Sequence, residues 1–214
     1  EPLRGTQICI LTCTRNLVES LDPLSGMPLY GLVCANNRLR SLDPFVENPP
    51  TNFVYDCETL DVAEIRRARA VWRTRKDRRH LAREADALLA LRQGQFGALR
   101  DMASRVGSHK VLFIPKAMTW KLARDFCEGL GGHLFVVRSE KEHAQLDAWF
   151  GSYWVWMGLR VTRKGPEWVT GEPVRYTNFS SPLHATRVGP KVFAKKWSAQ
   201  DEPDFENCFV IEWS

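Results

Sequence analysis

Apolar and polar positions along the chain fall into three successive patterns, and the first covers residues 1–58. Short apolar runs alternate there with turn-forming residues, a pattern that predicts brief strands. The turns are Pro23-Leu24-Ser25-Gly26, Asn36-Asn37 and Asn48-Pro49-Pro50. The pattern predicts five strands, at residues 7–12, 17–21, 28–34, 38–42 and 52–55.

A 21-residue repeat runs through this first segment. Gly5, Leu11, Cys13 and Ser20-Leu21-Asp22-Pro23 return 21 positions later as Gly26, Leu32, Cys34 and Ser41-Leu42-Asp43-Pro44. Seven matches at one offset indicate that one structural unit is used twice. We interpret this unit as a hairpin in a small antiparallel β-meander.

Residues 59–107 form the second pattern, with apolar positions at helical spacing. One helix face is predicted from Val62 to Trp72, and the spacing of apolar residues predicts a continued stripe from Leu81 to Val106. The basic run between Arg73 and His80 predicts a break near Arg75–Arg79, because like charges one turn apart weaken a helix. Gly107 is expected to end the last helix. The apolar stripe predicts that this basic helical segment docks on the C-terminal domain.

Residues 108–214 alternate between helix signals and aromatic strands. Thr119 can cap one helix, and Ser139-Glu140-Lys141-Glu142 has the spacing of a capping box for a second. Strands are predicted at 111–114, 134–137, 154–159, 167–170, 175–179 and 208–213. Two helices followed by several strands indicate an α+β domain. We expect its tryptophans to fill the core and Gly158 to mark a close backbone approach.

The motifs of this third segment resemble those of the C-type lectin-like domain family. They are, in order, Leu130-Gly131-Gly132-His133-Leu134, Trp156-Met157-Gly158-Leu159, Glu167-Trp168-Val169-Thr170-Gly171 and Phe209-Val210-Ile211-Glu212-Trp213. Each motif is weak alone, but together they follow the family's order through about half of the chain. The bacterial version of the fold is the most similar, and it often follows a basic helical segment. Residues 1–107 resemble no family that we can name.

The resemblance also shows where this chain departs from sugar-binding members, which hold calcium through a Glu-Pro-Asn or Gln-Pro-Asp loop and a Trp-Asn-Asp strand. Calcium requires six to eight oxygen ligands. The loop position here, residues 181–190, contains no carboxylate, and the strand position is Trp197-Ser198-Ala199. We therefore expect the calcium site to be lost. The acidic residues from Asp201 to Glu206 do not have the family's spacing, and we expect no metal and no cofactor.

The cysteines depart from the family as well. Cys127 occupies the position of the family's first-helix cysteine, but Ile211 stands where its partner would be, and Cys208 lies three residues earlier. A bulge could still allow a Cys127–Cys208 bridge, so that pairing stays open. The other four cysteines, Cys9, Cys13, Cys34 and Cys57, lack the paired short spacings of structural zinc sites, and we interpret them as small buried apolar residues.

Composition excludes several classes of protein. The chain of 214 residues is 44% hydrophobic and 26% charged, as in ordinary globular proteins. No apolar run is long enough to span a membrane and no signal peptide is visible, so the sequence leaves the compartment unknown. Motifs of common hydrolases and of phosphate-binding loops do not occur, and the formylglycine-generating relatives of the fold use paired cysteines where this chain has only Cys208. We expect no enzymatic activity.

The formal net charge of +5 suits an acidic partner. We predict a calcium-independent recognition module whose partner is a protein or carbohydrate-like ligand of acidic character. The stretch from Phe179 to Ser198 contains no aspartate or glutamate. The predicted binding residues within it are His184, Arg187, Lys191, Lys195 and Lys196. Two alternatives stay open. One is a scaffolding protein whose lectin-like domain packs on the helical arm, and the other is binding of nucleic acid by the arginine-rich helix, which we regard as the weaker.

Overall fold

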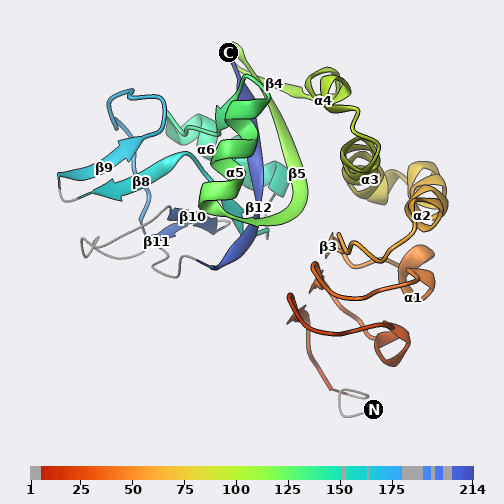
Figure 1. Ribbon diagram of the computed structural model, residues 1–214. Coiled ribbons are helices and arrows are strands. Elements are labelled where there is room, and N and C mark those ends of the chain that lie inside the picture. The colour runs from red at the N-terminus through yellow and green to blue at the C-terminus, as the bar shows by residue number, and fades with distance from the viewer. Residues whose placement is uncertain (1–5, 151–152, 163, 180–189, 194–195, 200–203) are drawn as a thin grey trace. The chain divides into compact units, whose positions relative to one another are not determined.

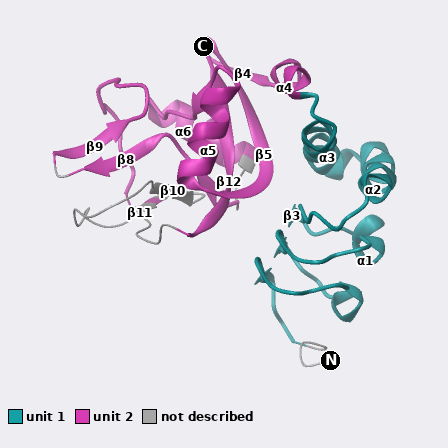
Figure 2. Ribbon diagram, viewed as in Figure 1, with its two compact units in different colours: residues 1–95 teal, residues 96–214 magenta. Residues whose placement is uncertain are grey.

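The computed structural model describes residues 6–150, 153–162, 164–179, 190–193, 196–199 and 204–214 (Figure 1). Contacts between residues group the chain into two compact units, residues 1–95 and 96–214 (Figure 2). The helices expected as a separate arm are divided between them: residues 62–92 belong to the first unit, and Phe96 begins the second.

The first unit begins with three stacked coils. Each coil contributes one short strand to a parallel sheet, and the turns η1 and α1 lie on the opposite side of the stack (Figure 1). The register joins Ile10 to Gly31 and Gly31 to Asn52, so each coil advances by 21 residues, the period of the sequence repeat. The bounds are β1 Ile10–Thr12, η1 Asp22–Leu24, β2 Gly31–Val33, α1 Asp43–Val46 and β3 Asn52–Val54.

The prediction of an antiparallel meander was wrong. The strands run parallel, and residues 17–21 and 38–42 are not strands. In a hairpin the two strands of one repeat would pair with each other, whereas here each repeat has one strand that pairs with the next repeat. The remainder of each repeat returns the chain to the same edge, as in solenoid proteins. Leu32, Leu39 and Leu42 fill the interior of the middle coil and are completely buried.

Asn37 ties the coils together through its side chain, which is only 6% exposed. Its Oδ1 accepts hydrogen bonds from the backbone N–H groups of Asn16 and Val18, both at 3.1 Å. Its Nδ2 donates to the carbonyl oxygens of Cys13 and Cys34 at 2.8 and 2.9 Å. These four backbone groups of two coils therefore have partners although they lie where no sheet ladder reaches them.

Two helices complete the first unit: α2 (Val62–Thr74) and α3 (Arg79–Arg92), joined by η2 (Lys76–Arg78). Asp61 caps α2 by accepting from the N–H of Ala63 at 2.7 Å, and α2 ends at Arg75, which has extended backbone. The predicted break near Arg75–Arg79 is confirmed. The apolar faces of both helices, including Trp72 and Leu81, share one core with the coils.

This core corrects part of the expected docking of the helical stripe on the C-terminal domain. Leu81, Ala85 and Leu88 pack among the coils of the first unit. The end of the stripe does pack within the second unit: Leu99 is completely buried, and the ring of Phe96, although partly exposed, lies 6.3 Å from the ring of Phe126. The stripe is not one helix: a turn at Gly94 separates α3 from α4 (Phe96–Met102), and residues 104–106 form a strand. Gly107 has φ 58° and forms the turn between two strands instead of ending a helix.

The second unit is built on a sheet with the strand order β11-β10-β7-β12-β5-β4, and β6 also pairs with β12. Helix α5 packs on β5 and β12 (Figure 1). The bounds are β4 Ser104–Val106, β5 His109–Thr119, α5 Trp120–Gly129, β6 His133–Leu134, α6 Glu140–Phe150, β7 Val155–Trp156, β8 Leu159–Thr162, β9 Gly165–Trp168, β10 Pro190–Phe193, β11 Lys196–Ala199 and β12 Glu206–Trp213.

Both predicted helix caps of this unit are confirmed. Thr119 Oγ1 accepts from the N–H of Leu122, and Ser139 Oγ accepts from the N–H of Glu142. The tryptophans at 120, 156, 168, 197 and 213 are all buried. A Cβ on Gly158 would lie 2.5 Å from the carbonyl oxygen of Leu134, so the expected close backbone approach is present. Residues 175–179 form no strand beyond one isolated bridge from Phe179 to Trp197.

Candidate functional site

Two of the five sequence-predicted binding residues lie in strands of the sheet. Lys191 lies in β10 and Lys196 in β11, and these two antiparallel strands form a ribbon at the edge of the sheet. Lys191 is opposite Ser198 across the ribbon, and Lys196 is opposite Phe193. His184, Arg187 and Lys195 lie outside the described residues, so the structure places only two of the five predicted positions.

The residues of the ribbon supply few oxygen ligands. Strand β10 reads Pro-Lys-Val-Phe and β11 reads Lys-Trp-Ser-Ala, so neither strand contains an aspartate, glutamate, asparagine or glutamine. Calcium binds to carboxylate, amide and backbone oxygens. A single serine hydroxyl is the only side-chain oxygen that these two strands offer, whereas they contribute two lysines.

An aromatic cluster anchors the ribbon through Trp197, which is completely buried. The rings of His143, Trp168, Tyr176 and Phe179 have their centroids 5.3 to 6.0 Å from the indole of Trp197. The backbone N–H of Trp197 also donates to the Asn178 carbonyl at 2.6 Å. Edge-to-face packing of this kind stabilises aromatic groups beyond the area they bury. The cluster therefore fixes β11 to the segment that leads into residues 180–189.

His143 of α6 holds that same segment by hydrogen bonds. Its Nδ1 lies 2.9 Å from the Tyr176 hydroxyl and 3.1 Å from Nδ2 of Asn178. An amide nitrogen only donates, so Nδ1 acts as an acceptor and the ring proton is assigned to Nε2. Burial lowers the pKa of His143, while the charges of Asp147 and Glu140 act in the opposite direction. The imidazole is therefore neutral near pH 7.

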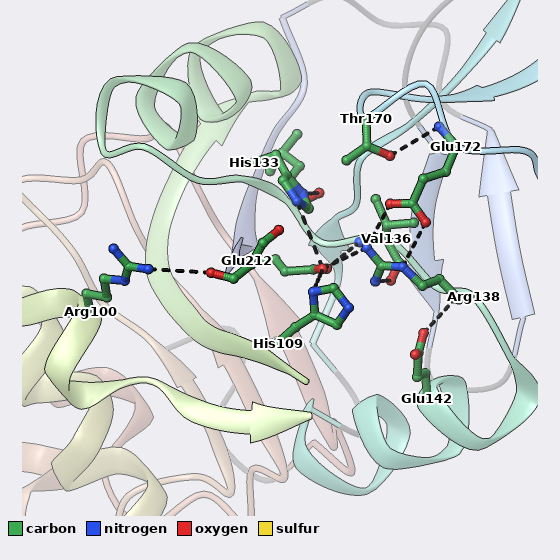
Figure 3. Close-up of polar contacts among 11 residues, drawn as sticks. Arg100, His109, His133, Val136, Arg138, Glu142, Thr170, Glu172 and Glu212 are labelled. Carbon is green, nitrogen blue, oxygen red and sulfur yellow. Dashed lines mark hydrogen bonds and ion pairs between the residues drawn. The ribbon is translucent and has the colours of Figure 1, made fainter. Parts of the chain in front are cut away.

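A second polar group, centred on Glu212 of β12, lies inside the domain (Figure 3). The side chain of Glu212 is completely buried. Its Oε1 lies 2.8 Å from Nη2 of Arg138 and 2.9 Å from Nδ1 of His109, and His133 Nε2 is 3.9 Å away. Its Oε2 accepts from the N–H of Val136 at 3.1 Å. We call these side chains, together with Glu172, the Glu212 network.

Arg138 links the buried carboxylate to the surface of the domain. Its guanidinium donates two parallel hydrogen bonds, each 2.9 Å, to the carboxylate of Glu172, and its backbone N–H donates to Glu142 of α6 (Figure 3). Burial alone would lower the pKa of Arg138, but the two carboxylates raise it above its usual range. Arg138 in turn lowers the pKa of Glu172. Arg138 is thus a permanent cation between two carboxylates.

Sequence reasoning missed the Glu212 network. Its members are far apart in the chain, and they meet only because β12 pairs with both β5 and β6. One signal was available: Glu212 stands between Ile211 and Trp213 in a strand that is otherwise apolar. A carboxylate in such a strand needs a buried partner.

One family model matches most of the second unit. Residues 116–214, somewhat less than half of the chain, match the family model described as the lectin C-type domain. This segment contains the Trp197 cluster, the ribbon and the Glu212 network except His109. Because of this similarity we call the second unit the lectin domain.

The chain is similar to parts of longer proteins. It is 27% identical to killer cell lectin-like receptor subfamily G member 1 of Homo sapiens, over 38% of this chain and 41% of the receptor. It is 32% identical to C-type lectin domain family 4 member G of Mus musculus, over 29% of this chain and 23% of that protein. The chain thus spans less than half the length of these two relatives.

Two solved structures superpose on about half of this chain. A calcium-independent type II antifreeze protein superposes with a TM-score of 0.48 at 21% identity, covering 52% of this chain and 91% of that protein. The carbohydrate-recognition domain of the mouse scavenger receptor C-type lectin superposes with a TM-score of 0.47 at 21% identity, covering 52% of this chain and 93% of that domain.

Two cysteines lie in the interior of the lectin domain. Cys127 of α5 and Cys208 of β12 are both buried, and the structure contains no disulfide bond between them. A register shift does occur between Asn207 and Phe209, as a bridge would have required, but it does not join the two sulfurs. Among the described residues no three His, Cys, Asp or Glu side chains form a group that could hold a metal ion. The described helices are also too short or too polar to cross a bilayer.

Proposed function

We propose that the lectin domain is a non-enzymatic recognition module that binds an acidic protein or glycan without calcium through the β10–β11 ribbon. The observation that carries this proposal is the composition of the two strands, which contain two lysines and no carboxylate or side-chain amide. The sheet supports it, because the ribbon lies at its edge. Charged groups at such an edge act mainly on the rate and specificity of association.

The packing around Trp197 supports the same assignment. A recognition surface must keep its shape before the ligand arrives, since ordering side chains on binding costs affinity. Trp197 packs against four aromatic side chains, and its backbone N–H binds the Asn178 carbonyl. These contacts fix the backbone of β11 to the interior of the domain. The ribbon therefore has a rigid base on which to present its residues.

Calcium dependence is tested by thermal unfolding with about 5 mM calcium and with excess chelator. A ligand that binds only the folded state stabilises it by about 2.7 kcal/mol when present at 100 times its Kd. We expect identical melting temperatures in the two buffers. A reproducible rise of several degrees in calcium would contradict the calcium-independent part of the proposal.

Ligand recognition is tested on an array of neutral, sialylated and sulfated glycans and acidic proteins, probed in chelator. The test variant is Lys191→Ala/Lys196→Ala. The matched control is Lys121→Ala/Lys141→Ala, which removes the same charge from exposed positions of α5 and α6. We expect acidic ligands to be lost by the first variant and kept by the second. Equal binding by the two variants would remove the ribbon as the site and favour the scaffolding role.

A further inference from the structure

Helices α2 and α3 carry the chain's excess of positive charge. Residues 62–92 contain ten Lys and Arg against four Asp and Glu, a net charge of +6, whereas the whole chain has +5. The remainder of the chain is therefore close to neutral. Nine of the ten cations are arginines, which bind carboxylates in a planar, bidentate manner.

Five of these cations are exposed and form no ion pair with any other residue that the structure describes. They are Arg66, Arg73, Lys76, Arg79 and Arg83, which we call the hairpin surface. The acids of the two helices are occupied elsewhere: Glu64 pairs with Arg67, Asp77 with Arg78, and Asp86 with Arg69. The fourth, Glu84, is buried.

The hairpin surface is continuous across the two helices. Arg66 and Arg73 are two turns apart on α2, about 10 Å along the axis, and Arg79 and Arg83 are one turn apart on α3. The ion pair between Arg69 and Asp86 joins the two helices next to these arginines. On α2, Arg69 lies between Arg66 and Arg73. On α3, Asp86 lies one turn after Arg83. Lys76 lies in the turn that connects the helices.

The start of α3 points to an anionic partner independently. Its first turn contains no acidic residue and no side chain caps it, although the N-terminal end of a helix carries partial positive charge. Arg79 is instead the first helical residue, and Arg83 stands one turn later. A cation at the positive end of a helix and a like charge one turn later each disfavour the helix. An anion bound at this end would be stabilised by the helix dipole as well as by the arginines.

We propose that the hairpin surface binds an acidic segment of a partner protein. Nucleic acid fits less well, because the exposed residues among the arginines include Ala63, Ala70 and Thr74, with no aromatic group to stack on bases. A membrane fits less well because Trp72 is buried and offers no anchor. This site goes beyond the lectin function and uses none of its residues.

The test measures fluorescence anisotropy of a labelled oligoglutamate peptide with the full chain. The test variant is Arg73→Ala/Arg79→Ala, and the matched control is Arg38→Ala/Arg40→Ala, which removes two exposed cations from the same unit. We expect the first variant to weaken binding about three- to tenfold, since exposed ion pairs contribute about 0.2–1 kcal/mol each. We expect the control to change it less than twofold, and salt of about 0.5 M to abolish it.

A DNA duplex and phosphatidylserine vesicles are measured in parallel. Tighter binding of either that is lost in Arg73→Ala/Arg79→Ala, but not in the control, would overturn the choice of an acidic polypeptide. Equal weakening by both double variants would show that net charge alone attracts the peptide, and would overturn the site. Absence of oligoglutamate binding at low salt would overturn it as well. Because Lys191 and Lys196 are unchanged throughout, none of these results bears on the lectin ribbon.

Discussion

The buried carboxylate of Glu212 lies 2.8 Å from the guanidinium of Arg138, although 73 residues separate them in the chain. Glu212 belongs to the central strand β12, while Arg138 leads from β6 to α6 and also holds Glu172. This ion pair thus joins the central strand of the lectin sheet to the segment that leads into α6, the helix that contributes His143 to the Trp197 cluster. An isolated buried carboxylate would cost several kcal/mol, so the pair must form for the sheet to form.

Arg138→Leu is expected to destabilise the protein by about 3–5 kcal/mol, because it leaves Glu212 buried without its cation. Arg160→Leu is the matched control: it also removes an arginine that pairs with a glutamate at 2.9 Å, but its side chain is 55% exposed. An exposed pair contributes about 1 kcal/mol or less. Urea unfolding followed by circular dichroism measures both values. Equal losses would show that the Glu212 network contributes no more than a surface pair.

Asn37→Ala is expected to destabilise the first unit by about 2–4 kcal/mol, because it leaves buried and partly buried backbone groups of two coils without these hydrogen bonds. Asn48→Ala, at an exposed position, should change stability by about 0.5 kcal/mol or less. Hydrogen exchange of the Asn16 and Val18 amides offers a local measurement. Unchanged protection of those amides in Asn37→Ala would contradict the assigned role.

Local signals allowed much of the lectin domain to be predicted. Thr119 and Ser139 cap helices because their hydroxyls reach N–H groups three residues away, and Gly158 is required by the close approach of the Leu134 backbone and the Val169 side chain. The parallel coils could not be found in this way, since strand direction depends on residues 21 positions apart. The direction of the strands was encoded instead in the leucines at 29, 32, 39 and 42 and in the buried Asn37. Period-two alternation alone favoured hairpins.

The candidate site divides in the same manner. The lysines of the ribbon could be found because a run without acids is visible in the sequence. The Glu212 network could not, because His109, His133 and Arg138 come from three different segments that only strand pairing brings together. The hairpin surface was visible as a charge run, but its unpaired members were not. Which arginines stay free depends on where Asp77 and Asp86 lie in the folded helices.

Stability should fall with acidity below about pH 6.5 through His143. Burial lowers the pKa of His143 from 6.5, so the unfolded chain binds its proton at a higher pH than the folded chain does. This contribution is complete above pH 6.5 and is lost as pH falls from that value toward the lowered one. Protonation of Nδ1 would also place a proton against the Asn178 amide. His143→Gln should flatten this part of the profile of unfolding free energy against pH. An unchanged slope in the variant would assign the acid sensitivity to other groups.

The six thiols should differ sharply in reactivity. Burial raises the pKa of Cys34 and of Cys127, which reduces the thiolate that reacts with alkylating agents, while Cys9 is exposed. Iodoacetamide should therefore modify Cys9 first in the native protein and leave Cys34 and Cys127 until the protein unfolds. Mass spectrometry of peptides taken at successive times measures the order, and Cys9→Ser, which should abolish the fast phase, is the control. After unfolding without reductant all six residues should be alkylated. Protection of Cys127 and Cys208 alone under those conditions would reveal a bridge between α5 and β12, and would contradict this prediction.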